Sequence, residues 1–319
     1  MNLMMWKNAF AAVQGVDHIA DNKPCQDATS SLHKNGVYAI ALADGAGSRK
    51  ASEHGSSILT KAITEALVQH FDQYYLMMES EDTINNGLPY KSLRDELIRI
   101  GRSALNQFLH KNNEWVYADL ASTLLFYAFK EDRYIMGHLG DGLIVGLFQG
   151  MTQEYMRVLS APDNGLEANI TFFFTESDVD DHFRLHKGLV RNLMGVILMS
   201  DGPEEVLYSK EEGLHDNTFK LFSNFKGINQ REYGQAIEKL LKENIANFSY
   251  DDLSLNVLYL DQFQLDENKK STQDILSKVQ YVEQIIQVSR VNFLIDLSRY
   301  GKRQLSNAQS AMTYLRSQT

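Results

Sequence analysis

Three apolar runs between residues 122 and 148 are separated only by short polar segments, and this spacing limits the possible folds. The runs cover 122–129, 133–139 and 143–148, and they are rich in the β-branched and aromatic residues that are typical of strands. The segment KEDR at 130–133 is short enough for a hairpin turn. Parallel neighbours would need a crossover of a dozen or more residues, so we predict a largely antiparallel sheet.

The same patterns extend the prediction to a whole domain. Further strands are expected at 37–43, 196–200 and 253–260, and apolar residues at helical spacing predict helices at 52–76, 92–110 and 231–246. We therefore predict one α+β domain over residues 1–261. A polar segment and a second helical pattern follow, which predict a linker and a helical tail over 262–319.

Composition excludes several classes of protein. Cys25 is the only cysteine among 319 residues, so no internal disulfide can form and the cytoplasm is the expected location. A net charge of −10 argues against nucleic acid as a partner. No apolar run reaches the roughly 18 residues that a membrane-spanning helix needs, and the N-terminus lacks the pattern of a signal peptide.

Carboxylates recur where the apolar runs begin or end. One such Asp-Gly pair is a common turn, but several carboxylates that meet at one sheet edge repel one another unless a cation neutralises them. Oxygen ligands without a cluster of Cys or His favour Mg²⁺ or Mn²⁺ over zinc. The residues concerned are Asp27, Asp44, Asp141, Asp201, Asp251 and Asp252.

Two other kinds of phosphate chemistry do not fit the sequence. The glycines near Asp44 match neither GxxxxGK[ST] nor GxGxxG, which excludes the common nucleotide-binding loops. A cysteine phosphatase would need an arginine six positions after Cys25, where Ser31 stands. Cys25 is therefore expected to be a buried small residue.

Six motifs in order resemble those of the type 2C metal-dependent protein Ser/Thr phosphatases, and in particular their bacterial PphC-like branch. They are PCQDA, ALADGAGS, ASTLL, GHLGDGLIVG, VILMSDG and DDLSL, and they cover the chain from about residue 10 to 261. The resemblance implies two packed antiparallel sheets flanked by helices, in an α-β-β-α sandwich. It also implies two divalent cations, Mn²⁺ or Mg²⁺, and hydrolysis of phosphoserine and phosphothreonine by a water that bridges the cations.

The resemblance assigns roles residue by residue. Asp44 corresponds to the carboxylate that bridges both cations, and Gly45 to the residue that offers its backbone carbonyl. Asp201 and Asp251 correspond to further ligands. Asp251 is favoured because the family's ligand stands three residues before a Ser or Thr, here Ser254, and Asp252 is the alternative.

The remaining matched residues have supporting roles. Asp27 resembles the acid that orders the water at the cations. Asp141 resembles the aspartate of a neighbouring turn and is expected to be structural, as is His138 just before it. Gly45 and Gly47 are expected to let the backbone turn tightly beside the cations.

The chain departs from the family at three positions. Asn22 stands where the family has a phosphate-binding arginine, and Gln26 replaces an acid. Ala46 stands where the DGHG version of the motif has a histidine that is proposed as the general acid.

Nearby residues are candidates for the missing roles. His18 could serve as the acid, because an imidazole transfers protons readily near neutral pH. Arg49 and Lys50 could bind the substrate phosphate, or they could be solvated residues in front of a helix.

The function predicted from the sequence is a metal-dependent protein phosphatase, with phosphorylated proteins as substrates and a cognate Ser/Thr kinase as a partner. The alternatives are an inactive binding or regulatory module with the same fold, and a hydrolase of small phosphorylated molecules. Residues 272–319 carry a net charge of +3, so the tail could dock an acidic partner or pack on the domain.

Overall fold

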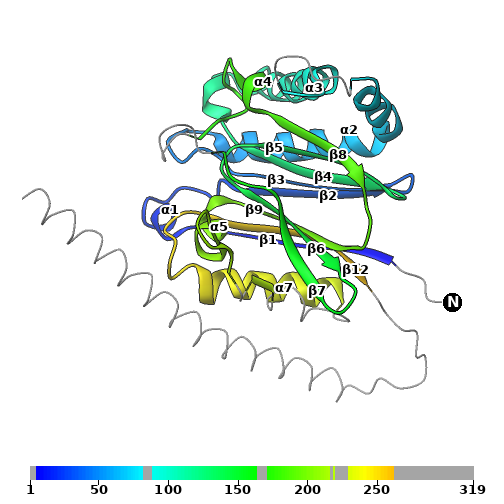
Figure 1. The fold of residues 1–319 in the computed structure, drawn as a ribbon. Coiled ribbons are helices and arrows are strands. Elements are labelled where there is room, and N and C mark those ends of the chain that lie inside the picture. Colours follow the sequence, from blue (N-terminus) through cyan, green and yellow to red (C-terminus); the bar gives the residue numbers. More distant parts are fainter. Residues whose placement is uncertain (1–4, 82–87, 164–170, 216–217, 220–228, 262–319) are drawn as a thin grey trace, which may run out of the picture. The chain divides into compact units, whose positions relative to one another are not determined.

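The computed structural model describes residues 5–81, 88–163, 171–215, 218–219 and 229–261. Two five-stranded antiparallel sheets pack face to face, and helices cover their outer faces (Figure 1). This arrangement confirms the predicted α+β sandwich. The predicted linker and helical tail at 262–319 lie outside the described residues.

The first sheet holds both ends of the described chain. In spatial order its strands are β1 (Met5–Val13), β12 (Leu253–Asp261), β9 (Leu193–Met199), β6 (Leu143–Gln149) and β7 (Glu154–Ser160). The helix α7 (Gln230–Leu240) packs on β1 and continues into a short π-helix, η2 (Leu241–Ile245). The buried side of α7 consists of Tyr233, Ile237 and Leu240.

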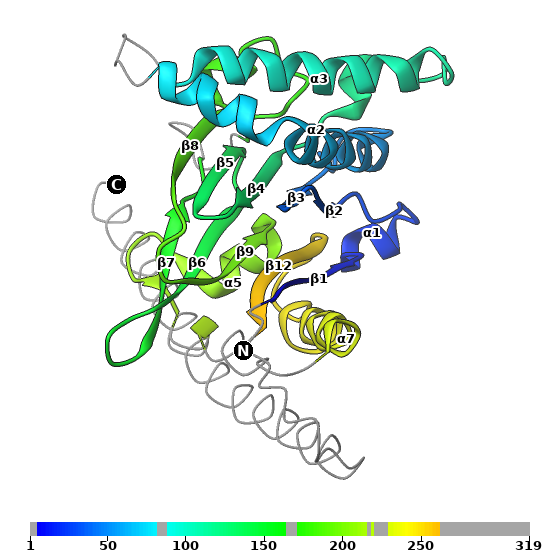
Figure 2. The same cartoon turned by 90° about the vertical axis from the view of Figure 1, so that its right-hand side faces the viewer.

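The second sheet carries the long helices. Its strands, in spatial order, are β2 (Ala28–Lys34), β3 (Val37–Ala43), β4 (Leu124–Lys130), β5 (Arg133–Leu139) and β8 (Arg184–Leu189). The helices α2 (Ser52–Ser80) and α3 (Lys91–Leu109) lie on its outer face (Figure 2).

The remaining elements are short. Figure 1 places α1 and α5 at the same end of the two sheets. The set comprises α1 (Val16–Ala20), η1 (Tyr117–Leu120), α4 (Val179–His182), α5 (Asp201–Leu207), β10 (Tyr208–Ser209) and β11 (Gly213–Leu214).

Alternation along the central strands divides the interior into two cores. In β3, Ala39 and Ala41 pack toward α2 and α3, whereas Ile40 and Leu42 face the other sheet. Successive side chains of a strand point to opposite faces, so one apolar run supplies both cores. The alanines on the helix side leave room for α2 to lie close to the sheet.

A buried amide joins the two sheets. The Asn256 side chain on β12 donates to the carbonyls of Ser30 and Ala41, both at 3.0 Å, and accepts from Asn8 at 2.6 Å. These bonds link β1, β12, β2 and β3 across the interface between the sheets. A buried amide needs such partners because leaving one unpaired costs about 1–3 kcal/mol.

The predicted strands are confirmed to within three residues. In the described chain six further strands were not predicted, of which β10 and β11 form a separate two-stranded sheet and four belong to the two large sheets. These four, β1, β2, β7 and β8, are the edge strands of the two sheets. Edge strands keep one side in solvent, so their sequences are more polar and the strand pattern is weaker. In the described part of the chain, no helix combines the length and apolar character needed to cross a membrane.

Two glycines on helices test the packing. A Cβ at Gly55 of α2 would lie 2.0 Å from the Leu120 carbonyl oxygen, whereas a Cβ at Gly234 of α7 would meet nothing closer than 3.6 Å. Gly55→Ala should lower the free energy of unfolding by about 1–3 kcal/mol because backbone atoms must move apart. Gly234→Ala should raise it by about 0.5–1 kcal/mol through helix propensity. Urea denaturation measures both, and equal signs would contradict this packing.

Candidate metal centre

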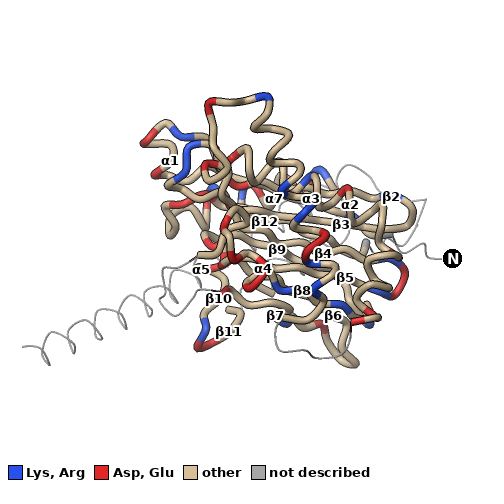
Figure 3. Tube along the Cα trace, turned by 90° about the horizontal axis from the view of Figure 1, so that it is seen from above, with Lys and Arg blue, Asp and Glu red and all other residues tan. Residues whose placement is uncertain are grey.

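Three aspartates from different strands meet at one end of the sheets. Asp44 follows β3, Asp141 lies between β5 and β6, and Asp201 follows β9 at the start of α5. One carboxylate oxygen of each lies within 4.8 Å of the others. All three side chains are partly exposed, and acidic positions gather near α5 in Figure 3.

Two further carboxylates act on this group. Asp251, exposed just before β12, raises the pKa of Asp44, Asp141 and Asp201, and buried Asp27 raises the pKa of Asp44 and Asp201. We refer to these five residues, Asp27, Asp44, Asp141, Asp201 and Asp251, as the acidic centre. The pattern of carboxylates at strand ends predicted that these residues meet, whereas the family resemblance gave Asp141 only a structural role.

Burial and mutual repulsion shift the acidic centre toward its protonated form. The pKa values of Asp44 and Asp201 lie well above the usual range, first because of burial and then because of the neighbouring carboxylates. Burial raises the pKa of Asp27 to about 7, and the charge of Asp252 adds to this increase. A cation bound among these groups would favour their charged forms.

Unpartnered oxygens support the same conclusion. Both carboxylate oxygens of Asp27, and Oδ1 of Asp141, are buried without a hydrogen-bond partner among the described residues. Ser200 and Ser254 lie close enough to lower the Asp27 pKa, although neither meets hydrogen-bond geometry with it. Buried polar atoms normally have partners, and a set of carboxylate oxygens suits a hard divalent cation. The residues present therefore fit Mg²⁺ or Mn²⁺.

Hydrogen bonds fix the backbone on both sides of Asp44. Its N–H donates to Thr123 Oγ1 at 2.9 Å, and the Thr123 N–H donates to the Asp44 carbonyl at 2.8 Å. The next residue, Gly45, forms an isolated bridge with Ser122. Ser122 and Thr123 precede β4, so the neighbouring strand positions the loop that carries Asp44.

Close packing, rather than an unusual turn, requires a glycine at position 45. A Cβ at Gly45 would come within 2.7 Å of the Gln26 carbonyl and 2.9 Å of Ser52. Neither Gly45 nor Gly47 has a positive φ angle, so the predicted need for glycine's backbone freedom is wrong. Close approach of neighbouring chain segments explains Gly45, whereas Gly47 has space for a side chain. The role of the Gly45 carbonyl as a ligand stays a prediction.

Asp252 holds the chain around the centre together. Its two oxygens accept from the Gly15 N–H at 2.6 Å and the Gln26 N–H at 2.5 Å, and Oδ2 lies 2.9 Å from His18 Nδ1. Asp252 is buried and its oxygens are already engaged, whereas Asp251 is exposed. These contacts favour Asp251 as the cation ligand, although one oxygen of each lies within 4.8 Å of a His18 ring nitrogen.

His18 lies against Asp252, although its Nδ1 does not meet hydrogen-bond geometry with any described partner. It lies on α1 and is buried, with Nδ1 toward Asp252. Its other nitrogen, Nε2, lies 3.6 Å from where a Cβ at Gly47 would stand. The ring therefore extends from Asp252 toward the turn that contains Ala46, the position where the family's histidine is missing.

The predicted phosphate-binding residues are exposed in the same turn. Arg49 and Lys50 lie just before α2 with exposed side chains. Lys23, which the sequence analysis did not select, also approaches this turn, with its ammonium 3.5 Å from the Gly47 carbonyl and 3.3 Å from Asp21. Lys23 directly follows Asn22, which stands where the family has an arginine. This neighbouring position in the sequence is what could have pointed to Lys23.

His138 supports the turn of Asp141, as predicted for a structural residue. Its Nε2 must donate to the Gly140 carbonyl at 3.0 Å, so Nδ1 accepts from the Ser160 hydroxyl at 2.7 Å. Complete burial, followed by the charge of Arg184, lowers its pKa well below the usual range. A neutral imidazole thus fixes Gly140, whose φ angle is +106°.

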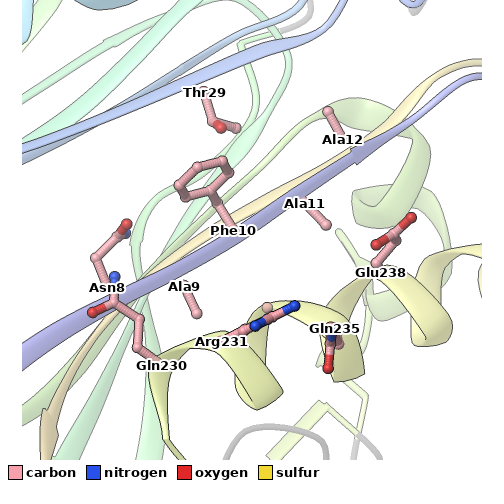
Figure 4. A pocket seen from close by; sticks show the side chains of 11 residues that line it. Asn8, Ala9, Phe10, Ala11, Ala12, Thr29, Gln230, Arg231, Gln235 and Glu238 are labelled. Atoms are coloured by element: carbon pink, nitrogen blue, oxygen red, sulfur yellow. The ribbon is translucent and has the colours of Figure 1, made fainter.

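A separate pocket lies between β1 and α7 (Figure 4). It has a volume of about 800 Å³ and is lined by Phe10, Thr29, Arg231 and Glu238 among others. No residue of the acidic centre lines this pocket. The candidate metal centre is therefore identified by its carboxylates and not by a cavity.

Comparisons with known proteins agree with this geometry. A family model described as protein phosphatase 2C matches residues 14–242. Serine/threonine-protein phosphatase 3 of Escherichia coli (strain K12) is 24% identical over 251 residues, which cover 76% of this chain and 92% of the relative.

Solved structures share the fold at lower identity. A serine-threonine phosphatase 2C from Toxoplasma gondii matches with a TM-score of 0.54 and 12% identity, over 82% of this chain and 96% of its own. Serine/threonine phosphatase Stp1 from Staphylococcus aureus matches with a TM-score of 0.51 and 16% identity, over 82% and 98%.

Replacement by asparagine should have different effects on stability and on Mn²⁺ binding at Asp251 and at Asp252. Asp252→Asn replaces one of two accepting oxygens with a donor, so it should lower the free energy of unfolding of the metal-free protein by about 1–3 kcal/mol. Asp251→Asn should leave that stability unchanged or higher, because it removes a repelling charge, and should weaken Mn²⁺ binding. Denaturation and calorimetric titration with Mn²⁺ separate the two effects. The reverse ranking would make Asp252 the ligand.

Stability of the metal-free protein should depend on pH through Asp27. Its pKa rises from 3.8 to about 7 on folding, so the native state holds more protons between these values and the free energy of unfolding falls as pH rises through this window. Asp27→Asn should reduce that fall. Buried His138 has a lowered pKa, so at low pH it makes the free energy of unfolding rise with pH. This contribution is the same in the intact chain and in Asp27→Asn, and it cancels when the two curves are subtracted. Parallel curves for the two proteins would refute the shift.

Proposed function

Because this chain belongs to the protein phosphatase 2C family, we propose that it hydrolyses phosphoserine and phosphothreonine esters in proteins with divalent cations held at the acidic centre. The observation that carries this proposal is the approach of the Asp44, Asp141 and Asp201 carboxylates to within 4.8 Å of one another. Such a group of acids is costly without a cation.

The chain's own residues divide the work at this centre. Asp44, Asp201 and Asp251 would hold the cations, together with Asp141. Divalent cations bound there would lower the pKa of water and neutralise charge on the phosphate. Asp27, with two unpartnered oxygens, would accept hydrogen bonds from water beside them. The resemblance to the family includes the motifs that carry Asp44, Asp201 and Asp251. The two cations that this resemblance implies, Mn²⁺ and Mg²⁺, are therefore both candidates.

We assign proton donation to the leaving group to His18. Asp252 contacts Nδ1, which leaves Nε2 facing the turn at Gly47. A positioned carboxylate on one nitrogen fixes the orientation of the ring, and the other nitrogen then serves the reaction. The alkoxide of serine or threonine is a poor leaving group, so its protonation matters for this substrate class.

Basic side chains in and beside the turn after Asp44 would bind the substrate phosphate. Arg49 and Lys50 are exposed there, and Lys23 lies beside Gly47. Arg49 offers a planar fork for two phosphate oxygens, whereas the lysines offer point charges. These assignments, a cognate kinase, docking by the tail and a cytoplasmic location stay predictions.

Other chemistries receive less support. Burial, and then the charges of Asp27 and Asp252, raise the pKa of the Cys25 thiol, which disfavours a thiolate nucleophile. An inactive module would have no need for the whole set of carboxylates. A hydrolase of small phosphorylated molecules would use the same centre, and comparing substrates distinguishes it.

Phosphate release from a phosphothreonine peptide tests the proposal. We expect activity to disappear in EDTA and to return with Mn²⁺ or Mg²⁺, and Asp44→Asn to lower it at least about 100-fold, since even residues that only support metal ligands cost about 10–100-fold. Asp132→Asn, an exposed acid in the hairpin between β4 and β5, is the matched control. Full activity without metal would refute the proposal, and faster turnover of nucleotides than of phosphopeptides would favour the small-molecule alternative.

A comparison of leaving groups tests His18. His18→Asn should slow hydrolysis of a phosphothreonine peptide by about 100-fold or more, which is the usual contribution of a positioned acid. It should slow p-nitrophenyl phosphate far less, because nitrophenolate leaves without a proton. His54→Asn, at an exposed histidine on α2, is the control. Equal slowing of both substrates would show that His18 only supports the structure.

A further inference from the structure

Two segments beside the acidic centre expose large apolar side chains. On α1, Val16 and Ile19 are 48% and 61% exposed, and Tyr250, directly before Asp251, is 71% exposed. We refer to these three residues as the apolar platform.

Backbone contacts bring the two segments together. The Asp17 N–H donates to the Tyr250 carbonyl at 3.1 Å. A Cβ at Gly15 would lie 2.4 Å from the Asp251 carbonyl carbon, so the start of α1 lies directly against residues 250 and 251. The residues of the apolar platform therefore lie on two segments whose backbones are in direct contact.

The platform borders the site on both segments. Tyr250 is bonded to the ligand residue Asp251, and His18 lies between Val16 and Ile19 in the sequence. On a helix, residues three apart share a face, so Val16 and Ile19 lie together on the exposed side while His18 turns inward to Asp252. One short helix thus presents a catalytic candidate inward and apolar side chains outward.

Folding does not explain these outward residues. Polar side chains at the same positions would leave the Asp252 contacts unchanged, because those contacts use His18 and backbone groups. Elsewhere in the described chain, Leu76 and Leu189 are exposed apolar residues on separate elements, and Met151 and Tyr155 are both exposed at the hairpin between β6 and β7, away from the acidic centre. Single exposed apolar residues are ordinary, whereas a group of them beside a site marks an interaction surface.

We propose that the apolar platform binds an apolar side chain of the phosphoprotein substrate, close to the phosphorylated residue. This inference rests on the proposed function, because the apolar platform adjoins Asp251 of the acidic centre. An extended peptide advances about 3.3 Å per residue, so the side chain would lie within a few residues of the phosphothreonine. Substrates with an apolar neighbour would then be preferred over wholly polar ones.

A set of phosphothreonine peptides tests this inference. The parent peptide is polar throughout, and each relative carries one leucine at a position from three residues before to three residues after the phosphothreonine. Release of phosphate is measured with Mn²⁺ for the intact chain and for the variants Ile19→Ser, Tyr250→Ser and Met151→Ser. The readout is the ratio of kcat/KM between each leucine peptide and the polar parent.

We expect at least one leucine position to raise kcat/KM about 3- to 10-fold, mainly through KM, because part of a leucine side chain leaves water. Ile19→Ser and Tyr250→Ser should return that ratio toward one, while Met151→Ser, at a distant exposed position, should keep it. A ratio of one at every position for the intact chain would overturn the inference, as would a preference that survives both platform variants.

Two further measurements distinguish substrate binding by the platform from the proposed function and from dimerisation. Turnover of the polar parent by the intact chain decides the proposed function independently of the platform. Sedimentation of the intact chain and of Ile19→Ser shows whether the platform instead joins two copies. A dimer that Ile19→Ser dissociates, without any change in the peptide ratios, would overturn the inference.

Discussion

Repulsion among carboxylates at one end of the sandwich is the constraint on which the rest of the structure depends. Antiparallel strands from both sheets end there, and they bring Asp44, Asp141 and Asp201 together at the margin of the core. The fold supplies no cationic side chain to any of the three among the described contacts, and burial raises each pKa. Charging all three carboxylates is costly without a cation, and this cost supports the proposal that a divalent cation binds there.

A second set of contacts keeps this centre in place. Asp252 joins the start of α1, the segment before β2 and the start of β12. It accepts hydrogen bonds from the Gly15 and Gln26 N–H groups, and its Oδ2 lies 2.9 Å from His18 Nδ1. The two adjacent acids therefore differ. The oxygens of Asp252 already accept hydrogen bonds within the protein, whereas the carboxylate of Asp251 is exposed and available to a cation. The same contacts orient α1, which places a histidine toward the centre and apolar side chains toward solvent.

The sequence was sufficient for the central strands and for most of the acidic centre, because runs buried on both faces and aspartates at their ends leave a clear pattern. It was insufficient for the four edge strands, whose polar residues on the solvent side weaken that pattern. The sequence could not decide between a structural Asp141 and one that joins the acidic centre, because a GD turn is common and only tertiary structure shows that Asp141 lies near Asp44 and Asp201. Gly45 was assigned to a turn, but its real constraint is the nearby Gln26 carbonyl, which belongs to a different segment that a local pattern does not describe.

Anomalous X-ray scattering from crystals grown with Mn²⁺ tests the central claim most directly, because it locates the cation without relying on activity. The account predicts anomalous density in contact with the carboxylates of Asp44 and Asp201, and loss of that density in crystals of Asp44→Asn. Crystals saturated with Mn²⁺ that show no density at the acidic centre, or show it only elsewhere on the protein, would contradict the account.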